Sequence, residues 1–549
     1  MTRPDEQRDG PVQAPAAPSA GIEIEITGYC HLDKPRIAAL IAGGRARDLV
    51  ALGGNYVIAA RRGEATWIAT SAYGAVSQFY HHGHDARGQA RFHHAARVGD
   101  VVRSAGLDWA WDFQALGDLF CLEHLTGEAS LHAEVRRTPA GSLLQWDGTK
   151  LDLWIADRAD LHREAASAVT GMSGRTMADH LVRLFTEELA RFDGVGAVLS
   201  ASGGFDSRLL LAGQLAGGGR PDLVVMGQPG STDGEVAEAI GRRFALPVRA
   251  IDLTAEDYVE AARHVPLATN GTKPLGHWHT YIYTRKAGLA QDAHFLVGSN
   301  GETVRSFFYD QGIKARLADL RPAGTATERY WQDNLRADVT AADLAAMPPQ
   351  LAAEFSDLAK RASRYSALGA RDGSDATGGP AESMLGRLDR FYLDQRVRHF
   401  IGNGLTLYGL NSNWRTPFLS IPWVAVAERL PRGWKLGSNW HRHAIHRLCP
   451  DLLDFPEDRV AGHMARRAPL FYWHWRRRRR PLVPYVDYRR LIANPTVLAL
   501  LADHASAIDD LLPRESVFRL IDQFRAGQRG FRSLSIFTSL AIWRWDSRA

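Results

Sequence analysis

The chain contains little cysteine for its length. Three cysteines occur among 549 residues, at Cys30, Cys121 and Cys449. Their number is odd and their spacing is wide, so the sequence excludes a disulfide framework and a Cys-x-x-Cys metal site. Sparse thiols of this kind are typical of a reducing compartment, and we therefore expect a cytoplasmic protein.

Long apolar runs and a strong charge of either sign are missing too. No run approaches the roughly 18–20 apolar residues of a membrane span, so we expect none. The formal net charge of +5 is small for this length and does not by itself indicate a nucleic-acid partner. Residues 1–20 lack the apolar centre of a secretion signal and are rich in Pro, Ala, Gln and Asp, which predicts a disordered tail.

The hydrophobic content of 45% suffices for two or three domains. Residues 21–157 alternate short apolar segments with Gly, Asp and His turns, which predicts a β-rich first domain with a few helices. Strands are expected at 22–26, 55–60, 65–70, 77–81 and 142–146. A polar stretch at 158–174 is expected to be a linker, followed by an amphipathic helix at about 177–192.

Residues 175–549 follow a different, α/β pattern. Apolar strands are expected at 195–199, 223–226, 248–253 and 293–297, with helical segments between them. This alternation implies right-handed crossovers and a doubly wound parallel sheet, which binds ligands at the carboxyl ends of its strands. From Tyr330 onward we expect mostly helices, with a mobile loop at 368–380, where Gly, Asp, Ser and Ala predominate.

The segment Ser-Gly-Gly-Phe-Asp-Ser, at 202–207, lies between the first of these strands and a leucine-rich helix. Glycines at a strand-to-helix turn let the backbone approach a ligand, and the amides of the new helix face an anion. Ser202 and Ser207 add hydroxyl donors, while Asp206 offers a carboxylate to a magnesium ion on phosphates. A tight turn with a capping serine is the alternative. The nucleotide-binding candidates here are Ala201, Ser202, Gly203, Gly204, Phe205, Asp206 and Ser207.

A second polar loop, Gly-Ser-Asn-Gly-Glu at 298–302, follows another expected strand. Because both loops would open on one edge of a parallel sheet, Glu302 could join Asp206 around a metal–pyrophosphate, with Val297 and Gly298 beside the nucleotide. Arg305 could neutralise charge on the leaving pyrophosphate. The alternative for Glu302 is an acid at a helix N-terminus.

Met226 ends the strand expected at 223–226 and precedes a Gly-Gln-Pro-Gly-Ser loop. The backbone there could pair with an adenine edge, leaving Met226 to pack on the ring. The alternative is an ordinary loop with a core methionine.

In this order the segments resemble the asparagine synthetase superfamily. Its pyrophosphate loop has the form Ser-Gly-Gly-x-Asp-Ser, and its Arg-x-Pro-Phe-Leu-Asp segment is similar to Arg-Thr-Pro-Phe-Leu-Ser at 415–420. Weaker similarities lie in the first domain, at 52–56, 73–80 and 137–141. The resemblance implies a glutaminase-like (Ntn-type α+β sandwich) domain, an adenylating domain with the ATP-pyrophosphatase sheet, ATP and magnesium as ligands, and AMP and pyrophosphate as products.

The departures from the family pattern narrow the range of activities that we expect. Glutamine-hydrolysing members begin Met-Cys-Gly, whereas this chain begins Met-Thr-Arg and its Cys30 follows an expected strand, so we expect no glutaminase activity. Members without that cysteine include β-lactam synthetases and lasso-peptide macrocyclases, in which an amine of the substrate attacks the adenylated carboxylate. Glu302 and Ser420 each stand where the family has Asp. These two changes bear on the identity of the acceptor substrate more than on the adenylation step.

Attack by an amine needs a stabilised oxyanion, which a lysine could supply. Lys435 is the only lysine after Lys360 and is our candidate; a solvated surface lysine is the alternative. His279, Tyr281 and Tyr283 could line the acceptor pocket, or pack in the core.

Five consecutive arginines, Arg476 to Arg480, follow the aromatic run at 471–475. They could hold a peptide partner, or form a solvated helix face. We expect a small-molecule or peptide substrate, with a precursor peptide or protease as further partners and no nucleic acid. The rival functions are asparagine synthesis from free ammonia, a non-catalytic scaffold and tRNA modification.

Overall fold

The computed structural model describes residues 21–192, 196–290, 292–308, 322–370, 383–457, 460–463, 483–528 and 530–548. Three features expected from the sequence lie outside these residues. They are the tail at 1–20, residues 371–380 of the expected loop, and the run from Arg476 to Arg480.

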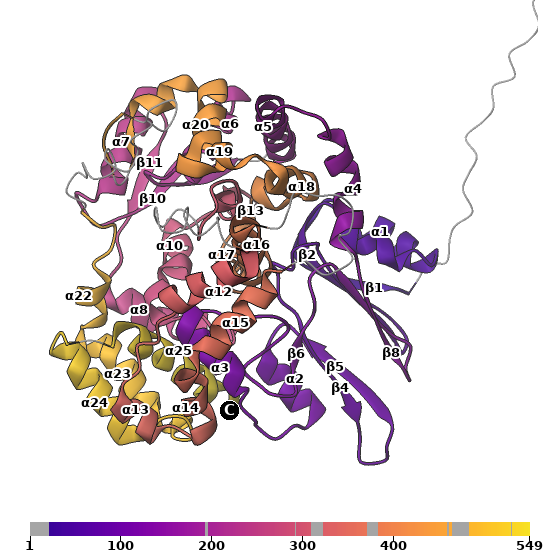
Figure 1. The fold of residues 1–549 in the computed structure, drawn as a ribbon, viewed down its shortest axis with the longest axis vertical. Coiled ribbons are helices and arrows are strands. Elements are labelled where there is room, and N and C mark those ends of the chain that lie inside the picture. Colours follow the sequence, from indigo (N-terminus) through magenta and orange to yellow (C-terminus); the bar gives the residue numbers. More distant parts are fainter. Residues whose placement is uncertain are drawn as a thin grey trace, which may run out of the picture.

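The N-terminal part is β-rich, as the sequence predicts, and the strands of its sheets pair antiparallel. One sheet has the strand order β1-β2-β3-β7-β8, and a smaller one has the order β5-β4-β6. The strands are β1 (Glu23–Cys30), β2 (Gly54–Arg62), β3 (Ala65–Thr70), β4 (Phe79–His84), β5 (Ala90–Ala95), β6 (Arg136–Arg137), β7 (Ser142–Trp146) and β8 (Leu151–Ile155). The helices of this part are α1 (Lys34–Ala42), α2 (Val98–Ala105) and α3 (Phe113–Leu122). Figure 1 shows these strands with α1 and α2 on one side of the molecule, whereas α3 lies among the helices of the C-terminal part.

A small core lies between α1 and the larger sheet. Ile37 and Ile41 of α1 pack in one buried cluster with Tyr56 and Ile58 of β2. Burying aliphatic side chains of this size contributes about 1.5–3 kcal/mol each. The helix begins after Asp33, whose carboxylate accepts a hydrogen bond from the Arg36 amide, and this N-cap fixes where α1 starts.

The stretch at 158–174, which the sequence predicts to be a linker, is mostly helical. Most of it forms α4 (Arg158–Ala168), capped by Asp157, and α5 (Gly174–Ala190) follows. The His162 side chain is buried, with its Nδ1 atom 3.3 Å from Glu428 Oε2. The helix forms despite its polar composition because its side chains find charged partners in the C-terminal part.

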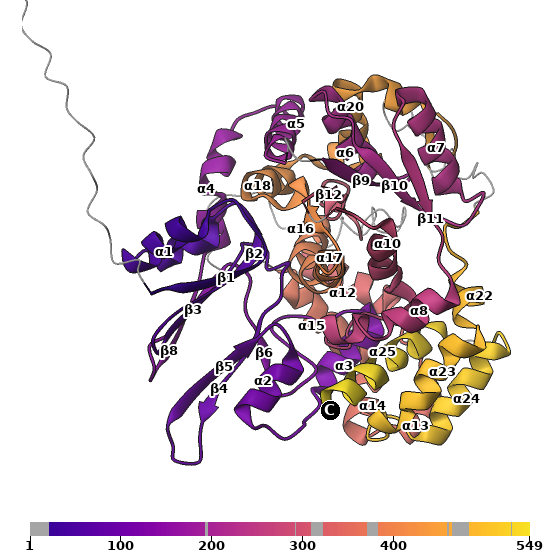
Figure 2. The same cartoon turned by 180° about the vertical axis from the view of Figure 1, so that it is seen from behind.

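A five-stranded parallel sheet organises the C-terminal part, as the alternating pattern predicts. Its order is β11-β10-β9-β12-β13, and every neighbouring pair is parallel. The strands are β9 (Ala197–Ala201), β10 (Asp222–Met226), β11 (Val248–Ile251), β12 (His294–Leu296) and β13 (Asn413–Arg415). The crossing helices include α6 (Phe205–Ala216), α7 (Thr232–Phe244), α8 (Ala255–Ala261), α9 (Val265–Ala268) and α10 (His279–Ala287). In Figure 2, α6, α7 and α20 (Asn439–Leu448) cover one face of the sheet, and α10 lies on the other.

Helices dominate after Tyr330, as expected. They are α12 (Ala323–Asn334), α13 (Ala341–Ala346), α14 (Pro349–Ser356), α15 (Leu358–Leu368), α18 (Ile421–Arg429), α19 (Arg432–Lys435), α22 (Tyr488–Ile492), α23 (Pro495–His504), α24 (Arg514–Arg525) and α25 (Phe531–Arg548). A short hairpin, β14 (Pro456–Glu457) with β15 (Val460–His463), lies among them. In the described residues no helix is both long enough and apolar enough to cross a bilayer.

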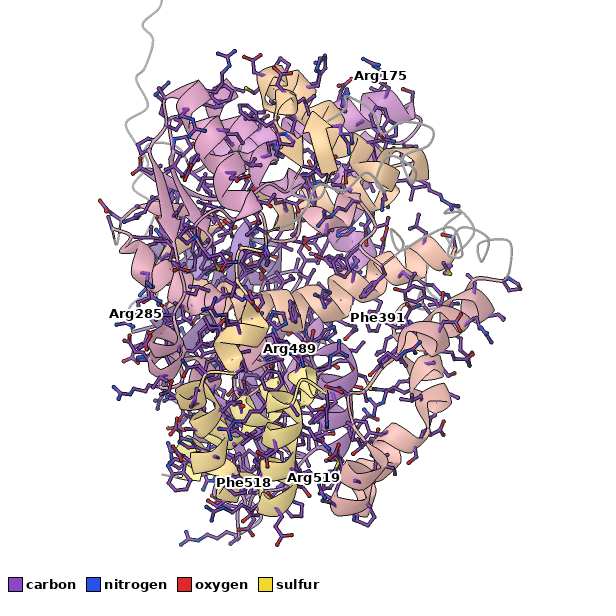
Figure 3. The ribbon with its side chains drawn as sticks, turned by 90° about the vertical axis from the view of Figure 1, so that its left-hand side faces the viewer. Arg175, Arg285, Phe391, Arg489, Phe518 and Arg519 are labelled. Atoms are coloured by element: carbon purple, nitrogen blue, oxygen red, sulfur yellow. The ribbon has the colours of Figure 1, made fainter. Side chains whose placement is uncertain are left out.

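One continuous helix crosses the molecule between Met384 and Gly409. It consists of α16 (Met384–Phe391), a π-helix (Tyr392–Ile401) and α17 (Gly402–Gly409). Figure 3 shows this helix from the side, near the label for Phe391. A π-helical stretch of this kind is rare and is often found at functional sites.

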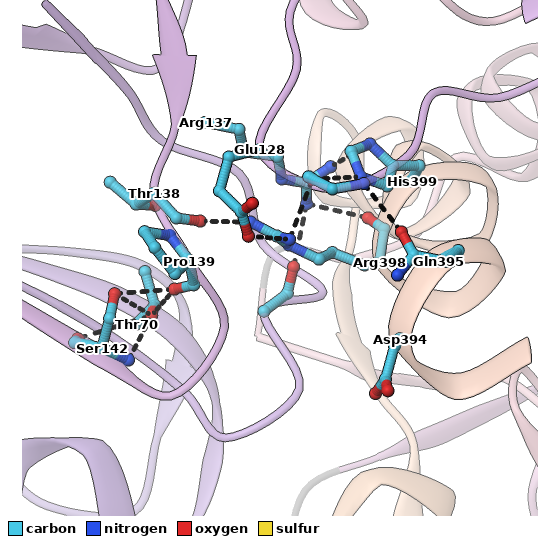
Figure 4. Close-up of polar contacts among 12 residues, drawn as sticks. Thr70, Glu128, Arg137, Thr138, Pro139, Ser142, Asp394, Gln395, Arg398 and His399 are labelled. Atoms are coloured by element: carbon cyan, nitrogen blue, oxygen red, sulfur yellow. Dashed lines mark hydrogen bonds and ion pairs between the residues drawn. The ribbon is translucent and has the colours of Figure 1, made fainter. Parts of the chain in front are cut away.

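The π-helix is fastened to the N-terminal part by charged hydrogen bonds (Figure 4). Arg398 donates to Glu128 Oε1 at 3.0 Å and to the Thr138 carbonyl at 2.6 Å. Arg137 donates in return to the Arg398 carbonyl at 2.8 Å. Because both arginines are buried, these bonds hold the helix in a fixed position relative to the N-terminal sheets.

Candidate functional site

The two polar loops found in the sequence meet at one edge of the parallel sheet. They follow β9 and β12, which are hydrogen-bonded neighbours. Gly298 lies so close to Asp206 that a Cβ atom on it would be 2.9 Å from the Asp206 Cβ. Gly301 packs against the carboxyl group of the same aspartate. Glycine at both positions therefore lets the second loop close onto the first.

The first loop turns directly from β9 into α6, and its polar groups bond to one another. The hydroxyl oxygens of Ser202 and Ser207 are 2.7 Å apart, and the Gly204 amide donates to Ser202 Oγ at 3.2 Å. The Gly203 amide donates to Asp233 Oδ1 at 2.6 Å. One amide donor of this loop is thus already paired with a carboxylate oxygen of the protein, as backbone amides at a strand-to-helix turn commonly pair with anions.

Asp206 contacts both a histidine and an arginine. Its Oδ1 atom is 2.7 Å from His441 Nε2, and its Oδ2 atom is 3.5 Å from Arg305 Nη2. Burial acts to raise the pKa of Asp206, but Arg305 and the hydrogen bond from His441 outweigh it, so the pKa lies below its ordinary value. The carboxylate is therefore kept ionised inside the fold.

Glu302 lies on the second loop and shares a partner with Asp206. Its Oε1 atom is 3.4 Å from the same Arg305 Nη2 nitrogen, and its Oε2 atom accepts a hydrogen bond from Tyr392 at 3.0 Å. The loop itself is held by Asn300, whose backbone is left-handed (φ 77°) and whose side-chain amide donates to the Phe418 carbonyl at 2.6 Å. The Arg-Thr-Pro-Phe-Leu-Ser segment therefore supports the loop that carries Glu302.

Lys435 is not the solvated surface residue that we considered as the alternative. Its side chain is 4% exposed, and its Nζ atom is 2.8 Å from Asp389 Oδ2. The same oxygen accepts a hydrogen bond from Ser306 at 3.2 Å. Burial raises the pKa of Asp389 against the opposing effect of Lys435. Since Ser306 follows Arg305 in the chain, the ion pair adjoins the second loop.

The remaining candidates are placed less centrally. Met226 packs against the core as a partly buried residue, and the amide of the following Gly227 donates to the Ile251 carbonyl at 2.9 Å. Val297 is buried beside Gly298. Tyr283 donates to the Val224 carbonyl at 2.5 Å beneath the sheet, which favours its core-packing alternative.

His279 and Tyr281 also lie in the helix before β12. The Nδ1 atom of His279 is 2.7 Å from the Tyr488 hydroxyl, and burial lowers the pKa of this histidine to about 3. Tyr281 is buried near His264, with ring centroids 5.3 Å apart. Within the part of the chain that the structure describes, neither residue bonds to Asp206 or Glu302, so their place in an acceptor pocket stays a prediction.

Sequence reasoning missed four residues that contact this site. They are Asp233, Asp389, Tyr392 and His441, which bond to Gly203, Lys435, Glu302 and Asp206. Asp233 is visible in the sequence as an acid in the first turn of the next helix. The other three come from helices far along the chain, where no motif marks them.

The chemistry and placement of Asp206 and Glu302 fit two ligands of one magnesium ion. Their side chains are 16% and 19% exposed, and both contact one guanidinium nitrogen of Arg305. One cation can therefore reach both carboxylates, and magnesium commonly binds through one or two carboxylates plus substrate phosphates. Among the described residues, no group of three or more His, Cys, Asp and Glu side chains could hold a metal alone.

Comparisons with known proteins point to the same superfamily as the sequence motifs. The chain is 23% identical over 497 residues to proteins of Mycobacterium bovis and of two strains of Mycobacterium tuberculosis. Each is named "Putative asparagine synthetase (glutamine-hydrolyzing)", and the alignment covers 82% of this chain and 69% of each relative. No family model matches the chain. The similarity supports a relationship to asparagine-synthetase-like proteins, and so to ATP-dependent amide ligases in general.

Proposed function

We propose that this protein is an ATP-dependent ligase that adenylates a substrate carboxylate and passes the acyl group to an amine. One observation carries the proposal. The Ser202–Ser207 loop and the Glu302 loop close on each other at the carboxyl edge of β9 and β12, with Arg305 between two carboxylates. This is the edge at which open α/β sheets bind their ligands.

In the first step, a carboxylate oxygen of the substrate attacks the α-phosphorus of ATP. The new oxygen–phosphorus bond forms as the bond to the β-phosphate bridge breaks, giving an acyl adenylate and pyrophosphate. The Ser202–Ser207 loop binds the pyrophosphate, and the Arg305 cation offsets its developing charge. Asp206 and Glu302 would hold magnesium, which when bound supplies further neutralisation of phosphate charge.

In the second step, the neutral amine nitrogen attacks the acyl carbon, the carbon–oxygen bond to AMP breaks, and the proton that the nitrogen loses passes to water. Lys435 stabilises the oxyanion of the tetrahedral intermediate, while Asp389 and Ser306 fix its position. Lysine at this place supplies a cation without reacting itself.

The attacking amine belongs to the substrate rather than to glutamine. Cys30 lies at the end of β1, and burial raises the pKa of its thiol, so little thiolate forms. We therefore favour a specialised ligase, such as a β-lactam-synthetase-like or macrocyclase-like enzyme, whose peptide substrate would derive from a precursor and a protease partner. Asparagine synthesis from free ammonia is the second candidate, because the mycobacterial relatives are named as putative asparagine synthetases of the glutamine-hydrolysing kind and we expect no glutaminase activity here.

The test is AMP and pyrophosphate formation from MgATP. Aspartate with ammonia, aspartate with glutamine, and peptides carrying both a carboxylate and a free amine are compared, with Asp206→Asn as the inactive variant and Asp333→Asn as an exposed-residue control. AMP with aspartate and ammonia would identify an asparagine synthetase. AMP only with a peptide would support the specialised ligase. No ATP binding at all would favour a scaffold and overturn the proposal.

A further inference from the structure

Arg396 differs from every other deeply placed arginine with a described environment. Five arginines are less than 5% exposed, and each donates to a backbone carbonyl or a carboxylate: Arg137, Arg208, Arg361, Arg398 and Arg442. Arg396 makes no hydrogen bond or ion pair within the described part of the chain. Its Nε atom is shielded from solvent and has no acceptor.

Two aromatic rings hold the Arg396 guanidinium instead. Its central carbon lies 4.8 Å from the ring centre of Phe307 and 4.1 Å from that of Phe400. Stacking of this kind orients a planar guanidinium while leaving its N–H groups without acceptors. Arg396, Phe307 and Phe400 are each partly exposed, whereas the Arg396 Nε atom is shielded, so a ligand would bind the other N–H groups of the guanidinium.

A second cation lies against the same ring. Lys273 Nζ is 4.0 Å from the centre of the Phe400 ring and donates to the Phe400 carbonyl at 3.2 Å. Burial, followed by the charge of Arg396, lowers the pKa of Lys273 to about 7. Glu302 and Glu123 are the carboxylates whose charges act on Arg396. Neither forms an ion pair with Arg396 among the described residues, because Arg305 contacts Glu302 at 3.4 Å and Arg532 contacts Glu123 at 3.5 Å. The Arg396 guanidinium therefore keeps no carboxylate partner of its own there.

The cluster also adjoins the proposed reaction site. Arg396 lies about one helical turn after Tyr392, which donates to Glu302. Phe307 follows Arg305 and Ser306 on the second loop. A ligand bound by Arg396 would thus lie beside the loop that carries Glu302.

We infer that Arg396, stacked between Phe307 and Phe400 and supported by Lys273, binds a carboxylate of the acyl substrate. The guanidinium presents paired N–H groups that match the two oxygens of a carboxylate. This carboxylate belongs either to a free amino acid or to a peptide side chain. The inference rests on the proposed function for the role of its ligand, while the binding itself is independent of catalysis.

Trifluoroacetate, a minimal carboxylate, is the probe for this site. The fluorine NMR signal of trifluoroacetate should broaden saturably as wild-type protein is added. The apparent Kd should be at least tenfold higher for Arg396→Met than for the wild type, and Arg396→Lys should give an intermediate value. Arg329→Met, which removes an exposed arginine of α12, should behave as the wild type. Trifluoroethanol, which is neutral, should not broaden.

Competition then identifies the source of the carboxylate. Displacement by aspartate or glutamate indicates a free amino acid, and displacement by an amidated peptide carrying one glutamate indicates a peptide. Equal broadening in wild type and Arg396→Met, or displacement by neither competitor, would mean an adventitious ion only and overturn the inference. If Arg396→Met does not fold, Lys273→Met serves as the second variant, with at least a threefold loss expected and no change counting against the site.

Binding with no carboxylate-dependent AMP formation would overturn the ligase proposal and leave the carboxylate site standing. If AMP forms but Arg396→Met leaves the KM for the carboxylate substrate unchanged, the carboxylate site is overturned and the ligase proposal stands. The two proposals therefore fail separately.

Discussion

His441 Nε2 lies 2.7 Å from Asp206 Oδ1, across more than 230 positions of sequence. The histidine side chain is fully buried, and its Nδ1 atom has no partner in the described residues. Its Nε2 proton is thus directed to Asp206. This bond and Arg305 keep the aspartate ionised although burial opposes its charge. The charge that the proposed chemistry needs is set by a residue outside either loop.

Replacing His441 should make the activity depend on the protonation of Asp206. In His441→Phe the hydrogen bond is lost, so burial is less opposed and the pKa of Asp206 rises. We expect the acid limb of the pH profile of kcat/KM for AMP formation to lie at higher pH in His441→Phe than in the wild type. Pairs of pH–rate profiles for the two proteins measure the change.

His443 offers a matched control on the same helix. Its Nε2 atom pairs with Asp179 Oδ1 at 2.8 Å instead. His443→Phe should leave the profile unchanged. An identical profile in His441→Phe and the wild type would contradict control of Asp206 by His441.

The Tyr392 hydroxyl should matter through Glu302 alone. Tyr392→Phe removes the 3.0 Å hydrogen bond to Glu302 and little else, and a bond to a charged group is worth about 1.5–3 kcal/mol. We expect AMP formation to fall roughly tenfold, since about 1.4 kcal/mol corresponds to that factor. Tyr330→Phe, at another buried tyrosine of the helical region, is the control. Equal rates for both variants would remove Glu302 from the proposed mechanism.

Much of the sheet architecture was predictable because local patterns dominate there. The strands expected at 65–70 and 142–146 are β3 and β7 with the same bounds. The glycine-rich turn at 202–207 also lies between strand and helix as expected. In these segments alternating apolar residues and turn glycines determine the conformation without distant partners.

Other elements depend on contacts that the sequence does not display. The strand β13 is only three residues long and contains no apolar run; its pairing with β12 makes it a strand. The helix α4 is polar, and Arg158 and His162 on it pair with Asp394 and Glu428. The side chains that complete the site, such as His441, likewise reach it from distant helices. Tertiary contacts override local preference at each of these places.

Variants of the Lys435–Asp389 ion pair should distinguish a structural role of Lys435 from a catalytic one. Breaking a buried ion pair costs about 3–5 kcal/mol, because one charge remains uncompensated, whereas replacing both partners by apolar residues is often nearly neutral. We expect Lys435→Met to lower Tm strongly and Lys435→Met with Asp389→Leu to recover it. Thermal unfolding of the single and double variants measures this.

The rate of ATP-dependent amide formation then distinguishes the two roles of Lys435. If Lys435 stabilises the oxyanion, the double variant should fold well but form product at least a hundredfold more slowly. Near-normal product formation in the recovered double variant would leave Lys435 with a structural role only. Lys360→Met, at the preceding lysine of the chain, should affect neither quantity.

Lys273 should make stability depend on pH in a defined direction. Its pKa is lowered from 10.5 to about 7, chiefly by burial. Between these pH values the unfolded chain binds a proton that the native protein has released, so this residue makes the free energy of unfolding rise with pH. Each pKa unit is worth about 1.4 kcal/mol. Lys273→Met should therefore raise Tm relative to the wild type at pH 6.5, with the difference shrinking or reversing by pH 9.5.

Thermal unfolding at these two pH values, with wild type and variant side by side, measures the effect. Lys286→Met is the comparison, since Lys286 is a third exposed and pairs with Asp257 at 2.8 Å; its Tm difference from the wild type should change little with pH. A Tm difference for Lys273→Met that is constant from pH 6.5 to 9.5 would mean that Lys273 keeps its ordinary pKa. In that case the positive charge beside Arg396 would persist over the whole range, because the lysine would stay protonated throughout.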